Sequence, residues 1–335
     1  MPLAERDRAA SRNRHGRPAR DALVAKPSRS AAPVTLAILN VSWQTLADAL
    51  ALGGVYALMA VGIGLVFGVL RLVNFAYGQL IMAGAYALAF ASQWGWPGWA
   101  GILLCFAVVL ALSVAMDRLV FRPLRTQSPA VMLVATFAVA FLLQSIALLA
   151  FGPLGKIASS LAPLNRPWTI SGVDIRKIAI VAIVVAAACL LLLQLLLTRT
   201  AVGLQMRAAA MDFGTARLLG VRANRVIGGA VLVSGVLAAV VAVMLTVQNP
   251  LVTPDFALRD TIVVLAGVVL GGLNRPVPAT LGGFAIGFAS GILGGALPTN
   301  QSQYLPTFLF AAVILVLLVR PNGLFTRGGG AVERV

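Results

Sequence analysis

Charged side chains are scarce in this chain. Asp, Glu, Lys and Arg make up 11% of its 335 residues, whereas an ordinary soluble domain has about 25%. Hydrophobic residues make up 60%, and they gather in runs near the roughly 20 residues that a helix needs to cross a bilayer. The runs are continuous, which excludes the alternating strands of a transmembrane β-barrel. The composition therefore predicts an all-α fold, a polytopic transmembrane helical bundle.

Histidine and cysteine are nearly lacking. The single His15 lies near the N-terminus, and Cys105 and Cys189 lie inside apolar runs. A cysteine in such a run behaves as a small hydrophobe, and one histidine with two such cysteines is too few ligands for the usual metal sites. We therefore expect no metal site and no disulfide framework.

Catalytic motifs are also lacking. The sequence has no Gly-x-x-x-x-Gly-Lys-Ser/Thr phosphate loop, because the nearest match, Gly152 to Ile157, has the wrong spacing and no hydroxyl. Neither a carboxylate pair nor a Ser/His/Asp set is available in the apolar region. We expect no catalytic residue and no cofactor. If ATP drives this protein, a separate subunit must hydrolyse it.

Positive charge is plentiful, at a net +16, but its placement argues against nucleic acid as a partner. The basic residues lie near the N-terminus and in short connections between apolar runs, a pattern that orients membrane proteins. Residues 1–30 have too little apolar area to fold, and we predict a disordered basic N-terminal tail, either drawn to anionic membrane lipid or inert. The transmembrane domain is expected at 31–326, and a C-terminal tail at 327–335.

Nine apolar segments predict about 8–9 membrane segments, some broken or re-entrant. Thr261–Leu273 is too short to span alone at 1.5 Å per residue, and Leu72–Ala91 is interrupted early by polar residues. The segments are Leu46–Phe67, Leu72–Ala91, Trp99–Met116, Ala130–Phe151, Ile178–Leu197, Val226–Val247, Thr261–Leu273, Ala279–Leu297 and Leu305–Val319.

The connections predict an orientation. By the positive-inside rule, three stretches should be cytoplasmic together with the C-terminus, and Gly152–Lys177 should be external. Five crossings before Thr198 would then place the basic N-terminus outside, against the rule. We therefore predict an incomplete crossing near Asn74. The cytoplasmic stretches are marked by Arg118, Arg122 and Arg125, by the segment 198–225, and by Arg275, with Arg320 and Arg327 at the C-terminal end.

The polar segment 198–225 predicts a helix over Gly203–Leu219, with Gly220 as a left-handed C-terminal stop. One face of this helix collects apolar and small residues at spacings of three and four. Such a helix lies on the membrane interface or docks onto a cytoplasmic partner. The face consists of Leu204, Ala208, Met211, Thr215 and Leu218.

Polar and glycine-rich breaks mark candidates for a translocation path. Polar groups inside a membrane are costly and often functional, although each is also a potential hydrogen-bond partner between helices. Glycine-interrupted runs at Gly64–Arg71 and Gly267–Arg275 indicate either a path near the midplane or close helix packing. The polar path candidates are Asn74, Tyr77, Gln79, Gln144, Ser145 and Gln248.

Several stretches resemble permease subunits of the branched-chain amino acid ABC (ATP-binding-cassette) importer family, over about residues 45–326. The polar segment is similar to that family's coupling loop, and Asn74-Phe75-Ala76-Tyr77-Gly78-Gln79 is similar to its Asn-Phe-Ala-His-Gly-Glu signature, with an ionisable pair replaced by neutral groups. Further matches are Leu52-Gly-Gly-Val-Tyr-Ala-Leu58, Gly267-Val-Val-Leu-Gly-Gly272, Leu281-Gly-Gly-Phe-Ala-Ile-Gly287 and Arg320-Pro321-Asn322-Gly323-Leu324-Phe325.

The resemblance implies an importer that carries branched-chain amino acids, or urea or short amides, across the cytoplasmic membrane. Its implied partners are a second homologous permease, two cytoplasmic ATPases and an external solute-binding protein. An ion-coupled secondary transporter is the alternative class, disfavoured because the acids outside the terminal regions, Asp255 and Asp260 among them, lie near span ends or in loops. The implied ATPase-coupling residues are Arg207, Ala208, Asp212, Ala216, Leu219 and Gly220.

Overall fold

The computed structural model describes residues 43–320, except for 71–73, 125–126, 166, 171–172, 212, 273–275 and 298–300. The predicted tails, 1–30 and 327–335, lie outside the described residues.

Within these residues, each of the nine apolar segments forms a helix, and the predicted all-α bundle is confirmed. Six helices are long and apolar enough to cross a membrane: α2, α4, α6, α7, α10 and α12. The other three are shorter, at 17, 14 and 15 residues. The nine are α2 (Trp43–Leu70), α3 (Tyr77–Gln93), α4 (Gly98–Met116), α6 (Pro129–Phe151), α7 (Lys177–Arg199), α10 (Ala223–Gln248), α11 (Leu258–Gly271), α12 (Pro276–Ala296) and α13 (Leu305–Val319).

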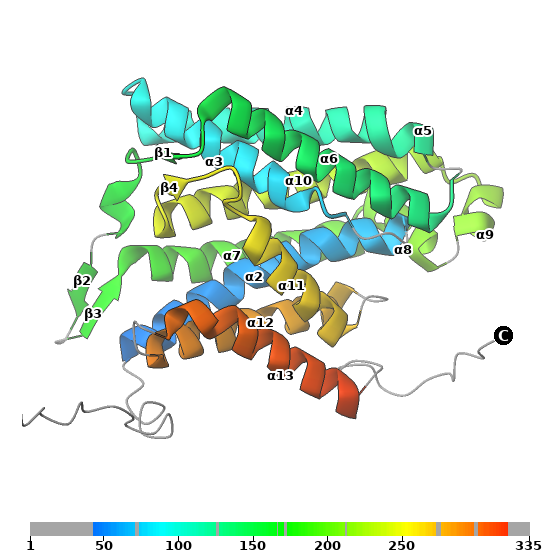
Figure 1. Cartoon of the computed structure of the whole chain (residues 1–335). Helices are drawn as coiled ribbons and strands as arrows, with labels where there is room; N and C mark the ends of the chain where they lie inside the picture. Colours follow the sequence, from blue (N-terminus) through cyan, green and yellow to red (C-terminus); the bar gives the residue numbers. More distant parts are fainter. Residues whose placement is uncertain are drawn as a thin grey trace, which may run out of the picture.

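Short elements cap the two ends of the bundle (Figure 1). A π-helical turn, Asp117–Phe121, joins α4 to α5 (Arg122–Leu124). Two short helices, α8 (Ala201–Met211) and α9 (Phe213–Leu218), lie at that same end, here called the α8 end. At the opposite β end, β1 (Lys156–Ile157) pairs with β4 (Leu251–Val252), and β2 (Pro167–Ile170) pairs with β3 (Val173–Arg176), both antiparallel. The stretches predicted to be cytoplasmic that the structure describes therefore share one end.

The path of the chain from α2 into α3 differs from the incomplete crossing that was predicted near Asn74. Helix α3 begins at Tyr77, inside the bundle, where the tyrosine ring lies against Gly62, the 20th of the 28 residues of α2. It then runs to the β end and contacts β1 and β4 (Figure 1). The helix is shortened at its start, yet the chain completes the return. The predicted incomplete crossing near Asn74 is therefore wrong, and α2 begins at the end opposite α8.

Glycines explain how α12 packs against α2, the central helix. Every fourth residue of α12 from Gly283 to Gly295 is glycine, and each lies where a Cβ would collide with α2. A Cβ at Gly287, for example, would fall 2.9 Å from the Leu52 carbonyl oxygen. Gly267 and Gly282 likewise bring α11 and α12 into backbone contact. Small residues let helices approach closely in a bilayer, so packing accounts for this late glycine-rich region.

Candidate functional site

The polar segment forms two helices, α8 (Ala201–Met211) and α9 (Phe213–Leu218), where a single helix over Gly203–Leu219 was predicted. They divide at residue 212, which lies outside the described residues. The predicted stop is confirmed: Gly220 has φ 88°, and the Val221 N–H donates to the Ala216 carbonyl oxygen at 3.0 Å. This hydrogen bond across a left-handed glycine is typical of a helix C-terminus.

Helix α8 is fastened to the bundle along one face. Gly203 lies so close to the Leu196 carbonyl that a Cβ would collide with it, which lets α8 fold back against the end of α7. Met206 is buried, and its methyl group lies 2.9 Å from where a Gly229 Cβ would stand on α10. Helix α8 also contacts α2. A displacement of α8 would therefore act on three membrane helices.

The opposite face of α8 and α9 is apolar and exposed. The periodicity predicted this face, and the structure turns it away from the bundle. We call the four most exposed large side chains of this segment the α8–α9 patch: Leu204 (61% exposed), Met211 (85%) and Leu218 (89%) from the predicted face, and Leu219 (80%), the residue after α9.

The predicted coupling residues divide between the two faces. Arg207, Leu219 and Gly220 are exposed, and Ala208 is half-buried. Ala216 is buried and faces the bundle, so it cannot touch a docking partner directly. Asp212 lies outside the described residues.

A polar pair that the sequence reasoning missed lies in the middle of the bundle. The Tyr56 hydroxyl donates to Asp260 Oδ1 at 2.7 Å. Tyr56 is the 14th of the 28 residues of α2, and Asp260 is in the first turn of α11. Asp260 therefore lies near the start of its helix, as predicted, but this helix begins beside the middle of α2, which places Asp260 at mid-depth.

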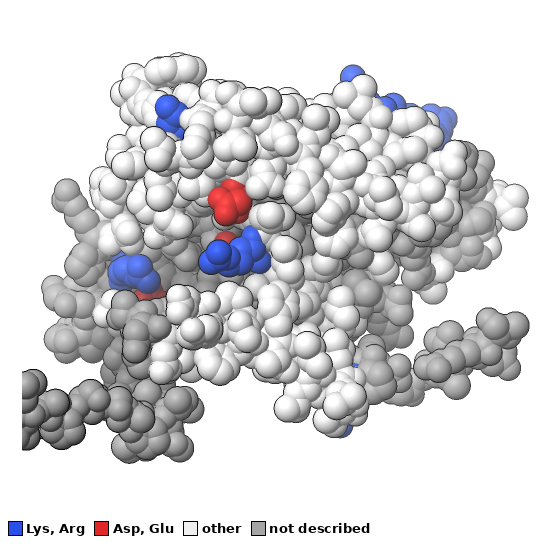
Figure 2. All heavy atoms as spheres, in the orientation of Figure 1, with Lys and Arg blue, Asp and Glu red and all other residues white. Residues whose placement is uncertain are grey.

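Two further charges flank this pair. Asp255 and Arg259 are exposed. Arg259 is near enough to Asp260 to interact with it electrostatically, although neither Asp255 nor Arg259 has a hydrogen bond or a close ion pair in the part of the chain that the structure describes. Figure 2 shows acidic and basic side chains gathered over the start of α11, in the middle of a broad uncharged surface. A charged side chain in the middle of a membrane protein is costly when it contacts lipid tails. The position of these charges therefore needs an explanation.

A cavity of about 400 Å³ adjoins Asp255. Two predicted path residues, Gln144 and Ser145 of α6, line it together with Asp255. Its volume falls within the 300–1,000 Å³ typical of small-molecule pockets. The remaining lining residues are Phe141, Leu148, Pro153 and Pro254.

The other predicted path residues lie elsewhere. Asn74 Oδ1 accepts the Ala76 N–H at 3.1 Å and so fixes the turn that enters α3. Tyr77 and Gln79 are buried, and neither the Tyr77 hydroxyl nor Gln79 Oε1 has a hydrogen-bond partner among the described residues. Gln248 ends α10 near the β end. These four do not line the cavity beside Asp255.

The start of α3 meets the start of α11. A Cβ at Gly78 would lie 3.1 Å from the Ala257 carbonyl oxygen and would collide with the Thr261 hydroxyl. Gly78 therefore permits two shortened helices to begin side by side within the bundle. Discontinuous helices that begin inside a membrane commonly border a solute path.

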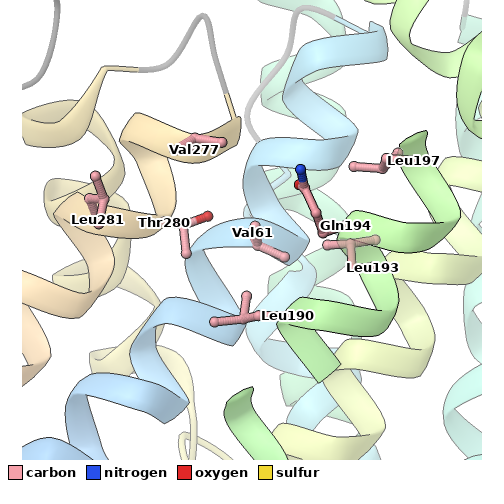
Figure 3. Close-up of a pocket in the computed structure, with 8 residues that line it drawn as sticks. All are labelled: Val61, Leu190, Leu193, Gln194, Leu197, Val277, Thr280 and Leu281. Carbon is pink, nitrogen blue, oxygen red and sulfur yellow. The ribbon is translucent and has the colours of Figure 1, made fainter. Parts of the chain in front are cut away.

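A second hollow lies between α2, α7 and α12 (Figure 3). Its volume is about 160 Å³, below the range of ligand pockets. Gln194 and Thr280 are its polar lining residues, and the others are Val61, Leu190, Leu193, Leu197, Val277 and Leu281. We regard it as a packing groove.

Comparison with known proteins gives consistent matches. The family model described as "Branched-chain amino acid transport system / permease component" matches residues 45–319. The high-affinity branched-chain amino acid transport system permease protein BraD of Pseudomonas aeruginosa is 31% identical over 304 residues, covering 87% of this chain and 97% of the relative. The corresponding LivH protein of Escherichia coli K12 is 28% identical over 306 residues, with the same coverage.

Among solved structures, PsaBC from Streptococcus pneumoniae in complex with Fab is similar, with a TM-score of 0.50 and 13% identity. The match covers 87% of this chain and 97% of that one. At this identity the likeness concerns the fold alone.

Proposed function

Because the chain belongs to the family of permease components of branched-chain amino acid transport systems, we propose that it is the permease subunit of an ATP-driven importer. As a multi-pass protein of the cytoplasmic membrane, it would pass branched-chain amino acids inward. The substrate follows from the names of the relatives. Urea or a short amide is the alternative within the same family.

The α8–α9 patch is the observation that carries the ATP-driven part of the proposal. Four large apolar side chains stand exposed at the end of the bundle where arginines gather. Exposed apolar clusters mark docking sites, and the sequence has no phosphate loop of its own. The partner that suits this surface is a cytoplasmic ATPase. Arg207, Ala208 and Leu219 would contact it, whereas Ala216 and Gly220 would hold the two helices in shape.

Movement would reach the solute path through helix contacts. Two ATPases that close on nucleotide would shift α8, and α8 packs on α2, α7 and α10. Packed helices respond as rigid bodies, so a small shift at one end changes which end of the path is open. A second homologous permease would form the other wall of this path, and a solute-binding protein would deliver the amino acid at the β end.

The test is uptake by the reconstituted importer. The chain, co-purified with its second permease and ATPases, is placed in proteoliposomes with the binding protein outside and ATP inside. We expect accumulation of radiolabelled L-leucine that requires ATP and survives ionophores, with no accumulation of urea. Because Asp260 lies at mid-depth, an ion-coupled carrier must be tested directly. Leucine accumulation by this chain alone on an ion gradient would refute the proposal.

Replacing Asn74 by leucine is expected to slow uptake without preventing membrane insertion. The substitution leaves the Ala76 N–H unpaired within the bundle, at a cost of about 1–3 kcal/mol, and so disturbs the entry to α3. Uptake rate and membrane abundance are measured together. Asn249→Leu, at an exposed position after α10, is the control and should be silent. Wild-type kinetics in Asn74→Leu would remove this turn from the mechanism.

A further inference from the structure

We propose that Asp255 and Arg259 form a binding site for the charged backbone of an amino acid, with the ammonium group on Asp255 and the carboxylate on Arg259. The inference rests on the proposed function and deepens it, because it assigns the recognition of substrate to named residues. The adjoining cavity would receive the side chain of the solute.

Arg259 and Asp260 lie at mid-depth in the bundle. The hydrogen bond from Tyr56 places Asp260 beside the middle residue of α2, and Arg259 precedes Asp260 in the same helical turn. Charged groups at this depth avoid lipid tails and instead face a protein partner or a water-filled path. This face of α11 is therefore a wall of the path between the two permeases and is not a lipid-facing surface.

The charges of Asp255 and Arg259 complement those of an amino acid. An acid and a base four residues apart are both exposed. Arg259 is near enough to Asp260 to interact with it electrostatically, but neither Asp255 nor Arg259 has a hydrogen bond or a close ion pair among the residues that the structure describes. A zwitterion supplies a partner for each, through charge-assisted hydrogen bonds that are stronger than neutral ones. A guanidinium is particularly suited to a carboxylate, because its donors match the two oxygens. Asp260 is already held by Tyr56, so Asp255 is the acid that remains available.

The surroundings of Asp255 also support the site. Its carboxylate is near enough to interact electrostatically with the hydroxyl of Tyr86 on α3, a buried group with no hydrogen-bond partner among the described residues. The cavity of about 400 Å³ opens beside it, with apolar Phe141 and Leu148 as well as polar Gln144 and Ser145. An apolar pocket with a few convergent polar groups is the usual form of a small-molecule site. It fits an aliphatic side chain attached to a charged backbone.

The experiment uses the complete importer in proteoliposomes and measures uptake of radiolabelled L-leucine from its loaded binding protein. We expect Arg259→Gln and Asp255→Asn each to lower the initial rate at least about tenfold, and Arg259→Lys, which keeps the charge but not the fork of donors, to retain an intermediate rate. Lys177→Gln, which removes an exposed charge at the β end, is the control and should stay within about twofold of wild type. Co-purification of the second permease is measured for every variant.

A second measurement does not depend on the charge substitutions. Ser145→Cys is placed in a background in which Cys105 and Cys189 are replaced by alanine, and labelling by a methanethiosulfonate reagent is followed during turnover. We expect leucine delivered by the binding protein to slow labelling at this cavity position. Equal labelling rates with and without leucine would overturn the site.

Each remaining outcome has a defined meaning. Near-wild-type uptake in both Arg259→Gln and Asp255→Asn overturns the site and leaves the proposed function standing. Loss of the second permease from these variants overturns it too, because the charges then pair between subunits. Failure of the wild-type importer to take up leucine, isoleucine or valine overturns the proposed function, and the site falls with it.

Discussion

Replacing Met211 and Leu218 together by glutamate is expected to abolish co-purification of the ATPase subunits with this chain. Both side chains are more than four-fifths exposed, so the substitutions leave the bundle itself undisturbed. Full burial of each is worth about 1.5–3 kcal/mol, and the pair therefore about 3–6 kcal/mol, or roughly 10²- to 10⁴-fold in affinity. Burying an unpaired carboxylate adds to the loss. Affinity purification of the complex from membranes gives the measurement.

A matched control distinguishes loss of docking from a general effect of surface charge. Leu154 at the β end is 90% exposed, so Leu154→Glu makes the same change as Leu218→Glu on the opposite end of the bundle. We expect the ATPases to remain bound in Leu154→Glu and to be lost in Leu218→Glu. An intact complex in the double variant would show that the ATPase subunits dock elsewhere on this chain.

Introducing valine at Gly283 is expected to prevent the bundle from assembling stably. A Cβ there would collide with the Ala60 Cβ and lie 2.8 Å from the Tyr56 carbonyl oxygen, so two rigid backbones would have to move apart. Overpacking of a tight contact costs about 1–3 kcal/mol and sometimes more, and a contact with backbone atoms lies at the upper end. Thermal unfolding in detergent, followed by size-exclusion chromatography, should show a lowered melting temperature.

The control for this prediction lies on the same helix. A Cβ at Gly294 would meet the flexible end of the Leu305 side chain at 3.4 Å, which can give way. Gly294→Val should therefore melt close to wild type, although it makes the same change in helix propensity. Equal destabilisation by the two variants would attribute the effect to valine in a helix and not to the contact between α2 and α12.

Local features of this chain were predictable from its sequence. Apolar runs and the left-handed stop at Gly220 depend on residues close together in the chain, and both predictions are confirmed. The periodicity of Leu204, Met211 and Leu218 also identified a real helical face. The periodicity could not predict whether this face points toward the bundle or away from it, because its exposure depends on how α8 folds back at Gly203.

Non-local features were beyond such reasoning. Asp260 is only two residues inside α11, so in the sequence it resembles a residue at a span end. Its mid-depth position comes from where α11 starts beside α2, which the contact with Tyr56 reveals. One signal was present: Thr261–Leu273 is too short to span, so its first turn had to lie inside the membrane if its far end reached the surface. The incomplete crossing near Asn74 was predicted wrongly for the same reason, because the place where α3 begins depends on its packing against α2.

The central position of α2 has a thermodynamic consequence. This one helix contacts α8 near one end and carries, at its middle, the tyrosine that holds Asp260. If ATPase engagement alters the solute site through α2, reciprocity requires that an occupied site alter ATPase engagement by the same factor. The substrate-loaded importer and the empty importer would therefore bind the ATPase subunits with different affinities.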